Sequence, residues 1–185
     1  MKKVVYIISA VIIMLTSASC GNNQKPSERS SVWGEDVDTT TVKGISLSSE
    51  KVFVPFQRTA SGLAQVQVSL NGVPFNMWWD TGASITSISS LEFIKLVKEG
   101  RVEEDDKIGS IQAKYADGSS GEEDVYRIRE ISIQGKDNEH LTLYGVAVSV
   151  SENLGAPLLI GQNVISELPK HKFNDDTEEI EFDKE

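Results

Sequence analysis

The segment Trp78-Trp79-Asp80-Thr81-Gly82-Ala83-Ser84 decides how this sequence is interpreted. It places a carboxylate directly after apolar residues typical of a buried strand. Such a carboxylate needs hydrogen-bond donors around it, because burial penalises its charged form. Gly82 lets the backbone turn so that its N–H approaches the carboxylate, and the hydroxyls of Thr81 and Ser84 are further potential donors. The segment is therefore suited to holding Asp80 in a defined protonation state.

The residues around this segment predict strands on both sides of it. Gln65–Leu70 alternates with period two, as a half-buried strand does. Asn71-Gly72 favours a type I′ hairpin turn, with Phe75–Trp79 as the return strand. A further short strand is expected over Ile85–Ile88.

A helix and more strands are predicted downstream. Ser89 and Glu92 form a capping-box pattern, and Gly100 closes the apolar helical face that follows. The remaining predicted elements are a hairpin of Ile111–Ala116 and Val125–Ile133 with its turn at Asp117-Gly118, a strand over Leu141–Val150, a buried strand over Leu158–Ile160, a helix over Gln162–Leu168, and final strands at Phe173 and Glu179–Phe182.

Together these features resemble the aspartic proteases of the retroviral, retropepsin-like type and their small bacterial members. The resemblance rests on Asp80–Ser84, on Ala113–Gly118, and on Leu158–Gly161 followed by the helix at Gln162. It implies a mainly β fold, a closed acid-protease β-barrel protomer with one or two short helices, over residues 51–185. In the family, the apolar-apolar-glycine segment (Leu159, Ile160, Gly161) threads behind the catalytic loop.

The resemblance also implies a mechanism. Two aspartates share a proton and activate a water molecule that attacks a peptide carbonyl. Because the sequence holds one Asp-Thr-Gly, two chains would each contribute the catalytic Asp80 across a two-fold axis. Thr81 would brace the two loops against each other and Ser84 would hydrogen-bond the carboxylate. The active-site loop is completed by Gly82 and Ala83, and no cofactor or metal is implied.

A flap would close over an extended peptide or protein substrate that lies as an added strand. The flap residues carried over from the resemblance are Tyr115, Asp117, Gly118, Ser119, Ser120 and Gly121, with a flexible tip over Gly118–Gly121. Glu122, Glu123 and Asp124 follow it; they favour basic substrates, alter the protonation of the site, or are simply solvated, and we expect solvation.

Other side chains admit more than one interpretation. One of Trp78 and Trp79 is expected in the core and the other on the opposite strand face, as packing or as a wall of the substrate cleft or dimer interface. His140 and His171 are expected at the surface without a catalytic role. The acidic C-terminal segment favours a charged edge strand over a binding tail.

Charge and cysteine content exclude several classes of function. The net charge is −10, which argues against nucleic-acid binding, since that needs a basic face. The single cysteine, Cys20, excludes an internal disulfide framework and a multi-cysteine metal site. With His140 and His171 as the only histidines, a histidine-rich metal cluster is not expected either.

The N-terminus is typical of a secretory signal. Lys2 and Lys3 precede the apolar run Val4–Leu15, which is shorter than the ~20 residues that a spanning helix needs. Small residues lead to Cys20, as in bacterial lipoproteins; an ordinary cleaved signal with an incidental cysteine is the alternative. We expect a signal over residues 1–19, a lipidated Cys20 with a polar tether over 20–50, and a location in the bacterial cell envelope, at the outer membrane or periplasmic face.

Three functional hypotheses follow. The first is a membrane-tethered homodimeric aspartic endopeptidase. The second is a catalytically inactive envelope lipoprotein of the same fold that binds a peptide or partner, with Asp80 as a hydrogen-bonded loop carboxylate. The third is a monomer that becomes active only when substrate or crowding at the membrane forces two copies to pair.

Overall fold

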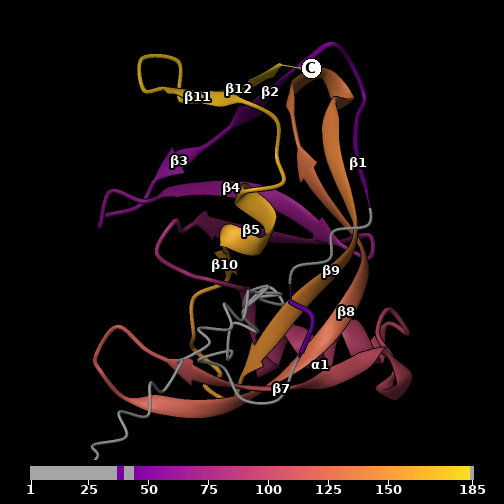
Figure 1. Ribbon diagram of the computed structural model, residues 1–185. Coiled ribbons are helices and arrows are strands. Elements are labelled where there is room, and N and C mark those ends of the chain that lie inside the picture. Colours follow the sequence, from indigo (N-terminus) through magenta and orange to yellow (C-terminus); the bar gives the residue numbers. More distant parts are fainter. Residues whose placement is uncertain (1–36, 40–43, 184–185) are drawn as a thin grey trace, which may run out of the picture. The chain divides into compact units, whose positions relative to one another are not determined.

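The structure is a computed structural model that describes residues 37–39 and 44–183 (Figure 1). This part of the chain is mainly β, with short helices between the strands. The strands are β1 (Gly44–Leu47), β2 (Lys51–Pro55), β3 (Gln57–Arg58), β4 (Ala64–Leu70), β5 (Val73–Trp79), β6 (Thr86–Ser89), β7 (Lys107–Lys114), β8 (Ser120–Gln134), β9 (His140–Ser151), β10 (Leu159–Ile160), β11 (His171–Asn174) and β12 (Glu179–Asp183). The helices are α1 (Ser90–Lys98), α2 (Gln162–Ile165) and the 3-10 helices η1 (Glu104–Asp106) and η2 (Lys136–Asn138).

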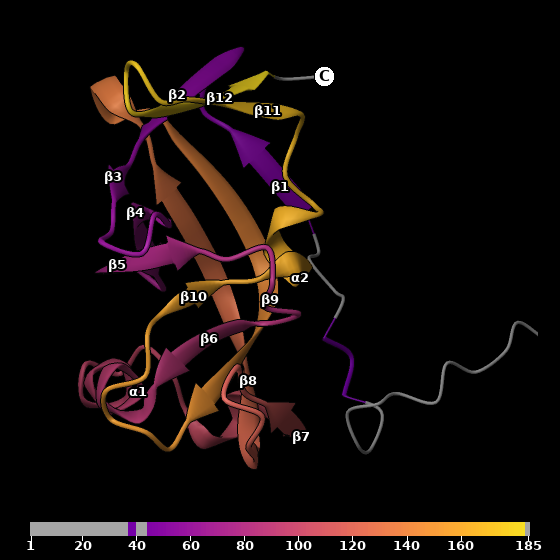
Figure 2. The ribbon, with the colours of Figure 1, turned by 90° about the vertical axis from the view of Figure 1, so that its left-hand side faces the viewer.

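The larger sheet has nine strands, with the order β1-β9-β6-β10-β5-β4-β8-β7 and β3 paired to β4. Strand β8 also pairs with β9, so the path of paired strands returns on itself. The predicted mainly β fold with one or two short helices is confirmed, and the structure has two α-helices. Figure 2 shows β5, β10 and β6 side by side, with α2 next to them and α1 and the β7–β8 hairpin beyond β6.

Local sequence signals have the predicted effect. Asn71 and Gly72 both have positive φ, 48° and 86°, as a type I′ turn requires. Ser89 caps α1 by accepting a hydrogen bond from the Leu91 N–H at 3.1 Å, and its hydroxyl donates to Glu92. The strand expected over Ile85–Ile88 lies one residue later, at Thr86–Ser89.

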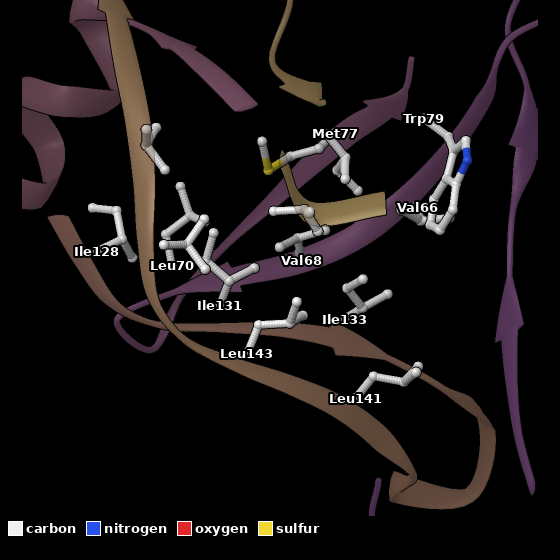
Figure 3. Close-up of a cluster of buried hydrophobic side chains, with 14 of the residues drawn as sticks. Val66, Val68, Leu70, Met77, Trp79, Ile128, Ile131, Ile133, Leu141 and Leu143 are labelled. Carbon is white, nitrogen blue, oxygen red and sulfur yellow. The ribbon is translucent and has the colours of Figure 1, made fainter. Parts of the chain in front are cut away.

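The apolar core lies between β4, β5, β8 and β9 (Figure 3). Alternate residues of β4, such as Val66, Val68 and Leu70, point into it and meet Met77 from β5. Burial of one such side chain contributes about 1.5–3 kcal/mol. The core therefore fixes the direction of β5, the strand that ends immediately before Asp80.

The smaller sheet corrects one prediction. Its order is β11-β12-β2, so the acidic strand β12 is central rather than an edge strand. Its acids pair with lysines: Lys51 Nζ lies 2.6 Å from Glu181 and Lys172 Nζ lies 2.7 Å from it. Lys172, and then Lys51, lower the pKa of Glu181, and Glu181 and Asp183 raise the pKa of Lys51. Cross-strand lysines thus make an acidic central strand compatible with pairing.

The sheet begins earlier than the predicted domain boundary at residue 51. Strand β1 lies within the predicted tether of residues 20–50 and pairs antiparallel with β9, with Gly44 opposite Tyr144 and Leu47 opposite Leu141. Leu47 packs against the core, which accounts for the ordering of a segment that is otherwise polar. The predicted signal and Cys20 lie outside the described residues. Among the described residues, no helix has the length and apolar character needed to cross a membrane.

Candidate active site

Asp80 is held at the end of β5 by a strand that is distant in sequence. Strand β10 runs parallel to β5, with Leu159 opposite Trp78 and Ile160 opposite Trp79. The Asp80 N–H continues this pairing by donating to the Ile160 carbonyl at 3.1 Å. The backbone of Asp80 is therefore fixed by the sheet, while its side chain is half-buried.

The turn after Asp80 aims a backbone donor at its carboxylate. The Gly82 N–H donates to Asp80 Oδ1 at 2.8 Å, and the Ala83 N–H donates to the Asp80 carbonyl at 3.3 Å. A Cβ at Gly82 would lie 3.1 Å from Asp80 Oδ1, a tight contact that would press on the carboxylate. Ser84 is exposed, and within the described residues its hydroxyl makes no hydrogen bond to Asp80. The donor expected from Ser84 is thus supplied by the backbone of Gly82.

Strand β10 also lies against β6, and Gly161 permits this contact. A Cβ at Gly161 would lie 2.4 Å from the Ile85 carbonyl carbon and 2.7 Å from the Thr86 nitrogen. The Gly161 N–H donates to Thr86 Oγ1 at 3.1 Å. The predicted segment Leu159, Ile160 and Gly161 thus lies between β5 and β6, behind the loop that carries Asp80.

Asn163 is a structural residue of the site that sequence reasoning missed. Its Oδ1 accepts from the Thr86 N–H at 2.8 Å and from Thr86 Oγ1 at 2.9 Å, and its Nδ2 donates to the Ala147 carbonyl at 2.8 Å. Next to it, Gln162 Nε2 donates to the Thr81 carbonyl at 3.1 Å. One amide therefore ties β6, β9 and α2 together. No local pattern marks this partnership in the sequence, because β6 reads Thr-Ser-Ile-Ser and Thr86 is one hydroxyl residue among several.

The β7–β8 hairpin contains the predicted flap residues. Its turn spans Tyr115–Ser119: the Tyr115 N–H donates to the Ser119 carbonyl at 2.9 Å. Asp117 Oδ1 accepts from the Ser119 N–H at 2.9 Å and from Ser119 Oγ at 2.6 Å, and these bonds lower the pKa of Asp117. Ser120 and Gly121 belong to β8, so the predicted tip over Gly118–Gly121 is shorter and is braced by Asp117.

One of the three flap acids is buried, contrary to the expectation of solvation. Glu123 is 4% exposed and accepts a hydrogen bond from the Tyr115 hydroxyl at 3.2 Å. Burial, together with the charge of Glu123, raises the pKa of Tyr115. Glu122 and Asp124 instead bond to Ser110 and Lys107 on β7. Side chains alternate along a strand, so the middle acid points to the opposite face.

Comparison with known proteins agrees with this geometry. Residues 66–167, more than half of the chain, match the family described as "gag-polyprotein putative aspartyl protease". The chain belongs to this family of aspartyl proteases. Among curated proteins, none matches.

One solved structure supports the fold of this member of the aspartyl protease family. The crystal structure of a retropepsin-like aspartic protease from Rickettsia conorii superposes with a TM-score of 0.50 at 12% identity, covering 75% of this chain and 94% of that one. The EIAV protease in complex with the inhibitor HBY-793 gives a TM-score of 0.41 at 16% identity, covering 60% of this chain and 92% of that one. The retropepsin-like fold predicted from the sequence is confirmed by the first of these.

The two tryptophans that precede Asp80 point in opposite directions, as predicted. Trp79 is 5% exposed, and its ring lies 5.3 Å from that of His171 and 5.8 Å from that of Phe173. His171 is therefore a packing partner of the core rather than a plain surface residue. Trp78 is half-buried on the other face, and His140 bonds to the Asn138 carbonyl.

Metal ligands do not gather at this site. Within residues 37–39 and 44–183, no group of three or more His, Cys, Asp or Glu side chains is arranged to hold a metal ion. The groups that bond to Asp80 are the N–H groups of Gly82 and Ala83 and the carbonyl of Ile160. Such an arrangement suits acid–base chemistry by the carboxylate itself.

The contact at Gly161 yields a stability prediction. Gly161→Ala places a methyl group against the backbone of Ile85, which cannot rotate away, so we expect a loss of about 3 kcal/mol or more in the free energy of unfolding. Gly155→Ala is the matched control, because its Cβ would meet nothing closer than Asn153 Oδ1 at 3.7 Å. Urea unfolding measures both variants. Equal stability of the two would contradict the proposed role of this contact.

Proposed function

We propose that this protein is an aspartic endopeptidase whose active site forms from two chains, each contributing Asp80. The observation that carries the proposal is the position of Asp80: at the end of a core strand, on a loop fixed from behind by Ile160 and Gly161, and bonded by the Gly82 N–H. That loop holds the carboxylate in place while leaving it half-buried and accessible.

Hydrolysis by the aspartic-type mechanism uses two carboxyl groups in different protonation states. Two adjacent carboxylates cannot both ionise freely, so the pair holds one proton. The ionised Asp80 takes a proton from a water molecule whose oxygen attacks the peptide carbonyl carbon, while the protonated Asp80 donates to the carbonyl oxygen. The carboxyl group that took the water proton then donates it to the nitrogen as the carbon–nitrogen bond breaks. The other carboxylate takes a proton from a hydroxyl of the tetrahedral carbon, which returns the pair to its singly protonated state.

The second carboxylate comes from a second copy of the chain. The sequence contains one Asp-Thr-Gly. Asp117 directly precedes Gly118 in the turn of the flap, where its carboxylate accepts hydrogen bonds from the N–H and the hydroxyl of Ser119. A two-fold axis beside Asp80 brings two identical loops together, and it gives exposed Thr81 a partner in the facing loop.

The substrate is an extended peptide. It lies between the Asp80 loop and the β7–β8 hairpin, where backbone groups bind it as an added strand and alternate side chains enter pockets. Trp78 is half-buried beside Leu159 at the end of β5, and it forms part of the wall that selects large apolar side chains. Closure of the hairpin excludes water from the reacting bond.

Replacing one carboxylate oxygen of Asp80 with an amide nitrogen tests the catalytic role of this residue. Asp80→Asn removes the ionisable group, so we expect cleavage of a diverse peptide mixture to fall by about a thousandfold or more at every pH from acidic to neutral. Asp105→Asn is the matched control, since Asp105 is exposed in η1. Mass spectrometry of the digest is the measurement. Cleavage by Asp80→Asn equal to that of the unmodified chain would contradict the assignment, and absence of cleavage in every form would favour the peptide-binding alternative.

We further propose that a lipid on Cys20 tethers the protease to a membrane of the bacterial envelope. Support comes from the sequence: two lysines, an apolar run and small residues precede this single cysteine. The remainder of the chain is acidic and would be repelled by an anionic membrane surface, so acyl chains rather than charge would hold it there.

Replacement of the anchor residue tests the tether. Cys20→Ser should move the protein from the membrane fraction to the soluble fraction on cell lysis, because no acyl chain can be attached. Cys20→Ser leaves the described domain unchanged, so its thermal stability serves as the internal control. Retention of Cys20→Ser in the membrane fraction would count against lipidation at this residue.

A further inference from the structure

The short segment Val37–Thr39 docks on the domain next to the candidate active site. Val37 is half-buried and packs with Ile85 and Ile108 onto a small apolar cluster. The Asp38 carbonyl accepts from Arg127 Nη2 at 3.3 Å, and the Thr39 carbonyl accepts from Asn163 Nδ2 at 3.5 Å. In Figure 2 the segment is the indigo stretch near the start of β6.

The apolar cluster under Val37 joins the two elements that would enclose a substrate. Ile85 directly follows the Asp80–Ser84 loop, whereas Ile108 and Ile111 lie on β7, the first strand of the flap hairpin. We call this cluster the valine notch. Its residues are Ile85, Ile108, Ile111, Val125 and Ala147.

Gly109 shapes the notch to fit Val37. Its φ is +143°, and a Cβ there would lie 2.7 Å from Val37 Cγ2. The β7–β8 register is irregular between Lys107 and Gly109, so the strand bends at this point. A glycine in a bulged strand often marks the close approach of another chain segment, and here that segment is Val37.

We propose that the valine notch is the outer end of the peptide channel, the space between the Asp80 loop and the β7–β8 hairpin where the substrate lies. The notch accepts one aliphatic side chain of an extended peptide. Val37 of the same chain occupies it until a longer peptide displaces it. This inference rests on the proposed function. A peptide strand advances about 3.3 Å per residue, so a substrate running from Asp80 past Ser84 reaches Ile85 a few residues from the scissile bond. Short peptides end before the notch.

The contacts of the segment suit displacement. The hydrogen bonds accepted by its Asp38 and Thr39 carbonyls, at 3.3 and 3.5 Å, lie at or beyond the long end of the usual range. Both donors keep other partners when the segment leaves: Arg127 Nη1 donates to the Gly145 carbonyl at 2.8 Å, and Asn163 retains Ala147 and Thr86. Release of Val37–Thr39 therefore leaves the brace behind the Asp80 loop intact.

Displacement has a measurable consequence. When only a fraction of the chains has a notch free of Val37, the apparent affinity for a peptide that binds there falls by that fraction. Weaker docking of Val37–Thr39 should thus favour cleavage of peptides that reach the notch and leave cleavage of shorter peptides unaffected. In the full chain, we expect Val37→Ser to raise kcat/KM about threefold to tenfold for a twelve-residue peptide, mainly through KM, and to leave a six-residue peptide with the same scissile bond unchanged.

Val97→Ser is the matched control, because Val97 is an exposed valine of α1 outside the notch. Equal changes for the long and short peptides, or no change for the long one, would overturn the proposal. A merely structural role for Val37 predicts the first of these results, because loss of stability lowers turnover of both peptides alike.

A second measurement does not depend on catalysis. Val37→Cys in a Cys20→Ser full chain carries one thiol, whose alkylation is slow while the segment is docked. A synthetic peptide with the sequence of residues 33–41, WGEDVDTTT, should compete for the notch and accelerate alkylation severalfold, whereas the same peptide with serine in place of its valine should not. The proposal is contradicted if both peptides or neither changes the rate.

The two measurements separate this inference from the proposed function. Acceleration by the valine peptide in a protein that cleaves nothing would support the notch as a peptide site and reject the protease assignment. Cleavage by the unmodified chain without any effect of the valine peptide would reject the notch and leave the protease assignment standing.

Discussion

The site depends on the insertion of Leu159–Ile160 between β5 and β6. Strand β5 precedes the Asp80 loop and β6 follows it, and β10 pairs with both strands. The Ile160 carbonyl fixes the backbone of Asp80, and Gly161 allows an approach to Ile85 that no side chain would permit. The loop between them has little freedom left, so the Gly82 N–H stays directed at the carboxylate. Pre-organisation of this kind is how a fold prepares a group for chemistry before the substrate binds.

Local signals made much of this predictable from the sequence. The Asn71-Gly72 turn, the Ser89 cap and the Asp-Thr-Gly motif each depend on a few neighbouring residues, whose conformational preferences are strong. The retropepsin-like fold was predicted because these motifs and their order resemble those of a known family. The opposite orientations of Trp78 and Trp79 followed from the two-residue period of a strand.

What sequence reasoning missed depends on contacts between distant residues. Asn163 braces Thr86 and Ala147, which are far from it in sequence. The acidic strand β12 is central because Lys51 and Lys172 come from the strands on either side. Glu123 is buried because Tyr115 covers it from across the flap turn. No local pattern encodes these partnerships, so only the folded chain shows them.

The valine notch connects the site to the segment that precedes the domain. Asn163 contacts both the brace behind the Asp80 loop and the carbonyl of Thr39. The proposed membrane tether would continue from this segment, so tether and substrate would meet at the same end of the channel. Under these two proposals, access of long peptides to the site would be linked to the position of the tether.

The proposed active site uses Asp80 from two chains. Unmodified chains and Asp80→Asn chains, refolded together at constant total concentration, test it through the dependence of peptide cleavage on the unmodified fraction. With half of the chains unmodified, a shared pair predicts about one quarter of the full activity, because both members of a dimer must carry the aspartate. Activity that falls only to about one half, in linear proportion to the unmodified chain, would contradict the account.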